Sequence, residues 1–257
     1  MKTGALYAKK AAFYGQLPWV ADKLFLNRIA ETIMQLDPDR ILDLGCGWGN
    51  LEHVISEEKS YLGVDRSSRM IETAERLKVG GEKHQFLNTN FQRFRYSEAF
   101  KGYVIVWKNV LHLERNWIDS VCKFVSDLNK CRGFIIVETV SPSVESLKWV
   151  KKLFHEILGA NHKVNWFTKG EIEETIKHYL GNKVSCTTEY YEQLIRFEAW
   201  LNTYGLSLED CKLAEEHFDN AIPVVSQDLQ MSREGEHHRI FLRLQEIVVV
   251  RLNNINK

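Results

Sequence analysis

Short apolar runs alternate with amphipathic segments through the first half of the chain. Each run has the length of a buried β-strand, and the five runs fall at residues 41–44, 61–65, 84–90, 103–107 and 133–140. Apolar residues at helical spacing mark the segments between them, at residues 50–57, 68–78 and 117–128. Strands that alternate with helices through five repeats predict an α/β fold with a doubly wound, mostly parallel sheet and right-handed crossovers.

The pattern changes after Pro142. Helical spacing is found over residues 144–157 and again over 170–180, where Thr168 and Glu171 form a capping-box pattern. A sixth strand is predicted at residues 183–191 and a last strand at residues 240–252. Residues 193–222 between these two strands are predicted to be helical, which indicates an insertion that covers a substrate rather than part of the core.

Composition narrows the class of protein. The chain has 257 residues, of which 44% are hydrophobic, and its 34 basic and 34 acidic side chains give a net charge of zero. A neutral chain lacks the positive field that binds a long nucleic-acid backbone or an anionic membrane. The chain has no apolar run long enough to span a membrane, and its five cysteines show neither CxxC pairs nor zinc-ligand spacing. We therefore expect a cytoplasmic protein without a bound metal.

The first predicted strand runs into three glycines, in the stretch ILDLGCGWGN at residues 41–50. Glycine accepts positive φ and lets a ligand approach the main chain, and ligands bind at the carboxyl ends of strands in open parallel sheets. A dinucleotide site favours GxGxxG, but here the spacing is GxGxG and Asn50 replaces the third fingerprint glycine. No Gly-Lys-Ser or Gly-Lys-Thr follows, which excludes a P-loop.

Two acidic residues flank the glycines. Asp65 ends the second predicted strand, where a carboxylate can accept both hydroxyls of a ribose; a cap of the following helix is the alternative, and the strand-end position favours the ribose role. Asp43 lies inside the first strand, two residues before Gly45. A carboxylate there can attract a ligand ammonium directly or through water, and S-adenosylmethionine has an ammonium whereas NAD has none.

Three stretches in order, ILDLGCGWGN, YLGVDRS and VWKNVLHL, resemble the class I S-adenosylmethionine-dependent methyltransferases, in particular their small-molecule branch, which includes enzymes of quinone biosynthesis. The resemblance covers residues 35–180. It implies a seven-stranded Rossmann-like sheet with helical lid elements, in one domain over residues 1–257. The expected parts are an N-terminal helical lid (1–36), a cofactor-binding core (37–140), substrate-covering helices with an insertion (143–222) and the last strand (240–252).

The resemblance also implies roles for individual residues in binding S-adenosylmethionine. Those placed at the methionine moiety and its amino group are Gly45, Cys46, Gly47, Asn109 and Asp43. Those placed at the ribose and adenine are Asp65, Arg66, Asn90 and Phe91. Asn90 stands where the family commonly has an aspartate, and its amide oxygen can still accept a hydrogen bond from the adenine amino group. Tyr103 is a second departure, near a position that is often acidic.

Candidates for chemistry on the acceptor are weaker. His112 follows the fourth strand and is either a general base or a histidine satisfied at the start of a helix. The candidate substrate-binding residues, each of which has packing as its alternative role, are Tyr14, Trp19, His155, His162 and Trp166. We expect methyl transfer to an oxygen or nitrogen of a small, partly aromatic or apolar acceptor. The alternatives are a carbon methyltransferase of quinone-biosynthesis type, a tRNA or protein methyltransferase, and a non-catalytic scaffold; the sequence indicates no oligomeric state.

Overall fold

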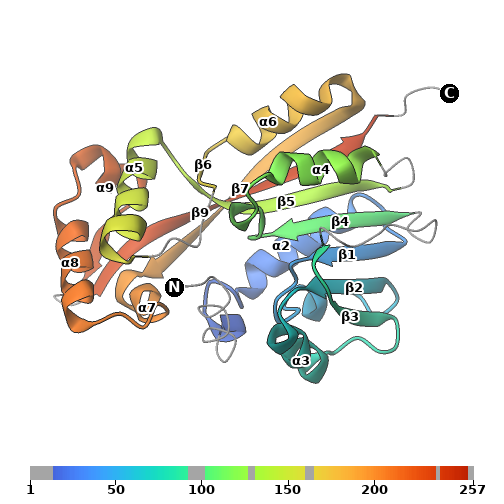
Figure 1. The fold of residues 1–257 in the computed structure, drawn as a ribbon, viewed down its shortest axis with the longest axis horizontal. Helices are drawn as coiled ribbons and strands as arrows, with labels where there is room; N and C mark the ends of the chain where they lie inside the picture. Colours follow the sequence, from blue (N-terminus) through green and yellow to red (C-terminus); the bar gives the residue numbers. More distant parts are fainter. Residues whose placement is uncertain (1–13, 92–101, 127–130, 160–164, 236–237, 254–257) are drawn as a thin grey trace.

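The computed structural model describes residues 14–91, 102–126, 131–159, 165–235 and 238–253. Its centre is one mixed, open sheet with strand order β3-β2-β1-β4-β5-β9-β7 (Figure 1). The strands on this path are β1 (Arg40–Leu44), β2 (Ser60–Asp65), β3 (His84–Asn88), β4 (Tyr103–Lys108), β5 (Gly133–Ser141), β7 (Val184–Arg196) and β9 (His238–Leu252). Strands β1 to β5 are parallel, and β9 runs antiparallel to both β5 and β7.

The α/β class and the mostly parallel, doubly wound arrangement are confirmed, but the expected strand number of seven is wrong. Two short strands join the sheet away from the main path, β6 (Phe167–Thr168) beside β5 and β8 (Ser232–Glu234) beside β9, which makes nine. Two or three residues are too few to show a period-two pattern. The tertiary pairing alone defines these strands.

Helices cover both faces of the sheet. The α-helices are α2 (Lys23–Met34), α3 (Ser68–Leu77), α4 (Trp117–Ser126), α5 (Val144–Lys152), α6 (Glu171–Leu180), α7 (Phe197–Asn202), α8 (Leu208–Asp219) and α9 (Pro223–Asp228). On one face α2 packs Ile29 and Ile33 against side chains of β4, β5 and β9, and this core includes Val106, Ile135 and Val249. On the other face α4 and α6 contribute Val121 and Ile176 to a separate core.

A helical group lies beside the sheet, at the left of Figure 1. Helices α5, α7, α8 and α9 share one buried cluster, to which Trp149, Phe197 and Phe218 belong. Strands β7 and β9 are long enough to extend beyond the other strands and meet this group (Figure 1). The helix predicted over residues 193–222 therefore begins later, because residues 193–196 still pair with residues 240–243 of β9.

The helix predicted over residues 50–57 is reduced to a single 3-10 turn, Glu52–Val54. Two consecutive turns precede it, closed by hydrogen bonds from Gly49 N to the Cys46 carbonyl and from Glu52 N to the Gly49 carbonyl. The Glu52 side chain is fully buried and accepts a hydrogen bond of 2.6 Å from Gly80 N. In a regular amphipathic helix a glutamate would lie on the exposed face. Here the Glu52 carboxylate points inward, and the segment forms turns instead.

Candidate functional site

The glycine loop leaves β1 at the point where the strand order reverses between β1 and β4. Gly45 and Gly47 both have positive φ, +78° and +56°, a region that side chains rarely adopt. A β-carbon on Gly45 would also lie 2.7 Å from Cγ2 of Val110, whereas one on Gly47 would meet no atom within 4 Å. The open space beside Gly47 is room in which a ligand can approach the main chain.

The carboxylate of Asp65 holds this loop to the start of α3. Its Oδ2 accepts a hydrogen bond of 3.1 Å from Gly47 N, and its Oδ1 accepts one of 2.8 Å from Ser67 N. Burial raises the pKa of Asp65, while these backbone N–H groups act in the opposite direction. Ser67, and not Asp65, caps α3, because its side chain accepts a hydrogen bond from Met70 N. The capping alternative for Asp65 is therefore wrong.

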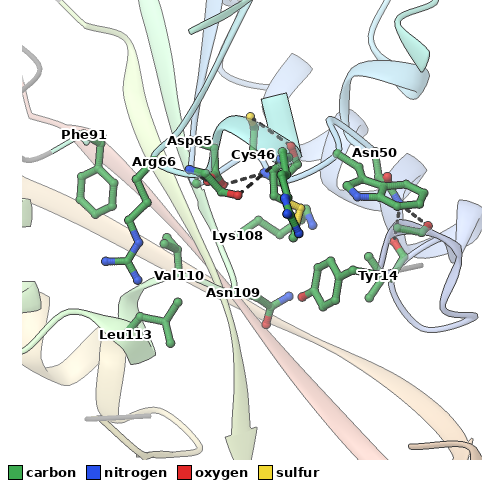
Figure 2. Close-up of a pocket in the computed structure, with 18 of the residues that line it drawn as sticks. Tyr14, Cys46, Asn50, Asp65, Arg66, Phe91, Lys108, Asn109, Val110 and Leu113 are labelled. Carbon is green, nitrogen blue, oxygen red and sulfur yellow. Dashed lines mark hydrogen bonds between the residues drawn. The ribbon is translucent and has the colours of Figure 1, made fainter. Parts of the chain in front are cut away.

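A cavity of about 460 Å³ lies at the carboxyl ends of β1, β2 and β4. Figure 2 shows Asp65 and Cys46 on one side of it, with Arg66 and Phe91 at one end and Tyr14 at the other. The residues predicted from the sequence that line it are Tyr14, Gly45, Cys46, Gly47, Asp65, Arg66, Asn90, Phe91 and Asn109. The structure thus brings together almost all of the predicted cofactor-binding residues.

Asp43 is the exception, because it does not line this cavity. Its side chain is fully buried, Oδ2 accepts a hydrogen bond of 2.6 Å from the Tyr61 hydroxyl, and Oδ1 has no hydrogen-bond partner in the described structure. Burial raises the pKa of Asp43 to about 6, and the charge of Lys108 opposes this rise. Lys108 itself lines the cavity, so a cation near Asp43 already borders the space in which a ligand would lie. Attraction of a ligand ammonium by Asp43 stays a prediction.

Asn50 ties the N-terminal segment to the glycine loop. Its Nδ2 donates to the carbonyl oxygens of Gly15 at 2.8 Å and of Val20 at 3.3 Å. Gly15 packs directly on Trp48, since a β-carbon there would lie 2.2 Å from the indole. The position that departs from the dinucleotide fingerprint therefore anchors the chain that closes one side of the cavity.

A second cavity, of about 130 Å³, adjoins the first, and Tyr14 and Asn109 line both. Its walls are mainly aromatic and come from the end of β5, the segment after it and the helical group. The aromatic residues in these walls are Tyr14, Trp19, Trp149, Phe154, Trp166, Phe167, Trp200, Tyr204 and Phe241. Asn109 is held between the cavities in the left-handed region, with φ of +55°, by a hydrogen bond of 2.7 Å from its N–H to the Val137 carbonyl.

His112 lines the second cavity and is paired with a carboxylate from β5. Its Nδ1 lies 2.9 Å from Oε2 of Glu138, and the Glu138 side chain is fully buried. Oε1 of the same carboxylate accepts a hydrogen bond of 2.6 Å from Leu111 N. The hydrogen bond that one ring nitrogen of a histidine makes sets which nitrogen carries the proton, so Glu138 orients the His112 ring.

The candidate substrate residues divide into two groups. Trp19 and Trp166 line the second cavity together with Tyr14. His155 lines neither cavity: it is exposed and contacts Trp166 edge-on, with ring centroids 5.6 Å apart. His162 lies outside the described residues.

The charged residues that the sequence analysis missed include Lys108 and Arg243, which line the cavities, and Glu138, which contacts His112. Each interrupts an apolar strand, as Asp43 does, in the stretches VIVWK, FIIVE and IFLRL. A charge inside a buried strand needs a partner or a function, so the same signal that singled out Asp43 was present at all three. Within the described ranges no group of side chains has the arrangement of a metal site, and no helix has the length and apolarity required to cross a membrane.

Residues 41–133 match the family described as "Methyltransferase domain", and this span includes the glycine loop, Asp65 and His112. Over this span the chain is similar to the class I S-adenosylmethionine-dependent methyltransferases. A demethylmenaquinone methyltransferase of Thermotoga maritima is 30% identical to the chain over 92 residues, which cover 32% of the chain and 40% of the relative. The chain thus matches less than half the length of that curated relative.

Solved structures extend the likeness over the whole fold. The YcgJ protein of Bacillus subtilis superposes with a TM-score of 0.74 at 16% identity, over 89% of this chain and 98% of its own. The plantazolicin methyltransferase BpumL, in complex with a desmethylplantazolicin analogue and S-adenosylhomocysteine, superposes with a TM-score of 0.58 at 17% identity. That match covers 96% of this chain and 90% of BpumL. At these identities the likeness concerns the fold.

Proposed function

We propose that this chain binds S-adenosylmethionine in the larger cavity and catalyses methyl transfer to an oxygen or nitrogen of a small, partly aromatic or apolar acceptor in the smaller one. The observation that carries the proposal is the adjacency of the two cavities. One contains the clamp between Asp65 and Gly47, the other has aromatic walls and a histidine paired with a carboxylate, and Asn109 and Tyr14 lie between them.

The residues of the larger cavity fit the proposed cofactor. Each oxygen of Asp65 accepts one backbone hydrogen bond and keeps further acceptor capacity, which two ribose hydroxyls can use. Arg66 and Phe91 form the end of the cavity at which an adenine would lie (Figure 2). Gly47 leaves space for the methionine moiety, and Lys108 supplies a positive charge for a carboxylate there. These are proposed roles for residues whose positions the cavity defines.

The bound cofactor supplies a methyl group on a sulfonium, which is already activated for displacement. The work left to the chain is to align an acceptor with that group and to exclude water. The aromatic walls of the smaller cavity exclude water, and the strained Asn109 separates the two ligands. His112, oriented by Glu138, takes the proton of an acceptor whose oxygen or nitrogen is protonated at neutral pH.

Carbon methylation of a quinone precursor is the second candidate. It is favoured by the 30% identity to a protein named demethylmenaquinone methyltransferase over the cofactor-binding segment. Nuclear magnetic resonance of the product separates the two, because the chemical shift of the new methyl group differs when it is attached to carbon, nitrogen or oxygen. A tRNA or protein acceptor fits a cavity of about 130 Å³ only through a single inserted side chain or base.

The experiment that tests the proposal is titration of the full chain with S-adenosylmethionine and S-adenosylhomocysteine by isothermal calorimetry. It is followed by transfer of a labelled methyl group to pools of small aromatic acids, phenols and amines. We expect binding of both cofactor forms and labelling of at least one pool. Absence of binding removes the proposal, and binding without transfer to any acceptor supports the non-catalytic scaffold.

A further inference from the structure

Arg243 is the one arginine in the wall of the smaller cavity among the described residues. It lies in β9 opposite Gln193 of β7, four residues after Arg239. Its side chain is half-buried. The position of Arg243 is fixed by the strand pairing, so its guanidinium is presented to the cavity by the rigid part of the fold and not by a loop.

Neutral amide oxygens surround this guanidinium. Its NH1 donates to Oε1 of Gln193 at 2.9 Å, and its NH2 lies 3.5 Å from Oδ1 of Asn109. The amide of Gln245 turns its oxygen toward the guanidinium, because the opposite orientation would point its NH2 group at another donor; that oxygen then lies 2.9 to 3.1 Å from NH1, NH2 and Nε. The five N–H donors of the Arg243 guanidinium therefore share three neutral amide oxygens, and the guanidinium can donate further hydrogen bonds.

The orientation of Gln193 is set by its other contacts. Its Nε2 donates to the Trp19 carbonyl at 3.1 Å and to Oδ2 of Asp22 at 2.9 Å. The amide oxygen is thus directed at Arg243, and the one nearby aspartate is used by Gln193 rather than by the arginine. The chain holds the guanidinium in place without neutralising it.

Arg239 on the same strand shows the contrast. Its guanidinium contacts the carboxylates of Glu198, Glu215 and Asp219 at 3.2, 3.2 and 2.7 Å. Arg243 makes no salt bridge with any described residue, although burial lowers its pKa. A buried cation normally has a carboxylate partner. The missing partner of Arg243 is therefore an acidic group that the protein does not itself provide.

The charges nearest to Arg243 reinforce this conclusion. Lys108 lies close enough that the Arg243 charge helps to lower the pKa of Lys108. Glu138 is a carboxylate whose charge acts on Arg243, but its two oxygens already contact Leu111 N and His112 Nδ1. Lys108 and Arg243 therefore both border the cavities, and this carboxylate is already engaged.

We propose that the acceptor of this chain carries a carboxylate on a small aromatic or apolar frame, and that Arg243 binds that carboxylate in the smaller cavity. Identifying the bound carboxylate as the methyl acceptor rests on the proposed function. The carboxylate-binding site at Arg243 does not depend on that function. A guanidinium matches a carboxylate through two parallel hydrogen bonds, and the aromatic walls bind the frame. A cavity of about 150 Å³ can hold benzene, so about 130 Å³ corresponds in size to about one aromatic ring.

The first test compares carboxylates with their uncharged amides on the same frame. The pairs are benzoate with benzamide, phenylacetate with phenylacetamide, and indole-3-acetate with indole-3-acetamide. Binding to the full chain is measured by calorimetry in the presence of saturating S-adenosylhomocysteine. We expect at least one carboxylate to bind about tenfold or more tightly than its amide, which is the effect of one charge-assisted contact. Equal affinities within all three pairs overturn the proposal.

The second test uses variants. Arg243→Gln should abolish the preference for the carboxylate, and Arg243→Lys should retain part of it, because lysine keeps the charge without the planar fork. Arg196→Gln is the matched control, since Arg196 lies on β7 and pairs with Glu234 at the surface. It should keep the full preference. A preference that survives in a folded Arg243→Gln protein overturns the assignment. If Arg243→Gln does not fold, the test uses Arg243→Lys. A reduced preference for the carboxylate in Arg243→Lys supports the assignment, and an unchanged preference overturns it.

Cofactor binding is followed separately in every variant. Affinity for S-adenosylhomocysteine should stay within about threefold of the wild type in Arg243→Gln, a change of less than 1 kcal/mol. An equal loss of cofactor affinity would mean that Arg243 binds the cofactor carboxylate instead, which overturns the inference while leaving the proposed function intact. If the wild type binds no cofactor but still prefers carboxylates, the proposed function fails and the carboxylate site at Arg243 stands.

Discussion

Glu138 holds Nδ1 of His112 at 2.9 Å across the gap between β5 and the turn that follows β4. His112 lies in the wall of the aromatic cavity, and Glu138 also fixes the turn through the N–H of Leu111. A carboxylate that orients an imidazole in this way sets which nitrogen carries the proton. Because Glu138 fixes the orientation of the ring, His112 is a candidate general base with a defined geometry.

Replacement of His112 by glutamine should lower turnover with little effect on cofactor affinity. Loss of a general base reduces rates by about 10²- to 10⁴-fold, whereas His112 does not line the cofactor cavity. The rate is measured as labelled methyl transfer to the acceptor found in the screen, and affinity by calorimetry. His178→Gln, an exposed change on α6, is the control. Parallel losses of rate and affinity in His112→Gln would indicate a structural histidine.

Glu138 should act through His112 as a positioning residue. Glu138→Gln should lower turnover in the wild-type background and have little further effect when His112 is already glutamine, because coupled residues are not additive. The double-mutant cycle is completed with urea unfolding of all four proteins. Equal fractional losses of turnover in both backgrounds would show that Glu138 supports the fold instead.

Asp65→Ala should weaken binding of S-adenosylmethionine by about 1–3 kcal/mol, the usual effect of leaving polar partners unpaired. Part of this loss comes through the loop, since Asp65 also binds Gly47 N and Ser67 N. Calorimetry on Asp65→Ala, Asp65→Asn and the exposed control Asp119→Asn separates the effects. An unchanged affinity in Asp65→Ala removes this residue from the ribose role.

Asp43 should make the protein less stable as the pH rises from about 4 to 6. Its pKa is raised from 3.8 to about 6 by burial, so the unfolded chain releases this proton first and the free energy of unfolding falls through that window. The full difference corresponds to about 3 kcal/mol. Asp43→Asn removes this pH dependence. The free energy of unfolding of the variant minus that of the wild type should therefore be more favourable to the variant at pH 7 than at pH 4.

Urea unfolding of Asp43→Asn at both pH values measures the difference, with Asp119→Asn as control. The Tyr61 hydroxyl can still donate to the asparagine oxygen, so the loss of its short hydrogen bond to Asp43 is only partial. A stability difference between Asp43→Asn and the wild type that is the same at pH 4 and pH 7 would contradict a raised pKa at this site.

Asn50→Ala should release the segment around Gly15 from the glycine loop. The two hydrogen bonds from Asn50 Nδ2 to carbonyl oxygens are the contacts removed, at about 1–2 kcal/mol of local stability. Hydrogen exchange over residues 14–21 should become faster, and S-adenosylhomocysteine should bind more weakly. Asn27→Ala on the exposed side of α2 is the control, and unchanged exchange in Asn50→Ala would exclude the anchoring role.

Local signals were sufficient where a residue's role depends on its neighbours in sequence. The five parallel strands, the glycine loop and Asp65 were all predicted, because apolar runs and glycines reflect burial and backbone conformation directly. The residues brought into the larger cavity follow from one rule, that parallel strands end at a common edge. Expectations failed over residues 50–57 and 193–196, where a buried carboxylate and a strand pairing override local helical preference.

What the sequence by itself determined about this chain is its resemblance to a family, its sheet and the place where a cofactor can meet the backbone. Only the tertiary structure decided that Glu138 meets His112, that Asn50 anchors Gly15, that Lys108 lines the larger cavity, and that Arg243 faces neutral oxygens instead of a carboxylate. The physical reason is that the partners of charged side chains lie far apart in the sequence, by 134 residues for Asn109 and Arg243 and by 171 for Asp22 and Gln193. Their pairing is set by how the strands assemble, which no local pattern records.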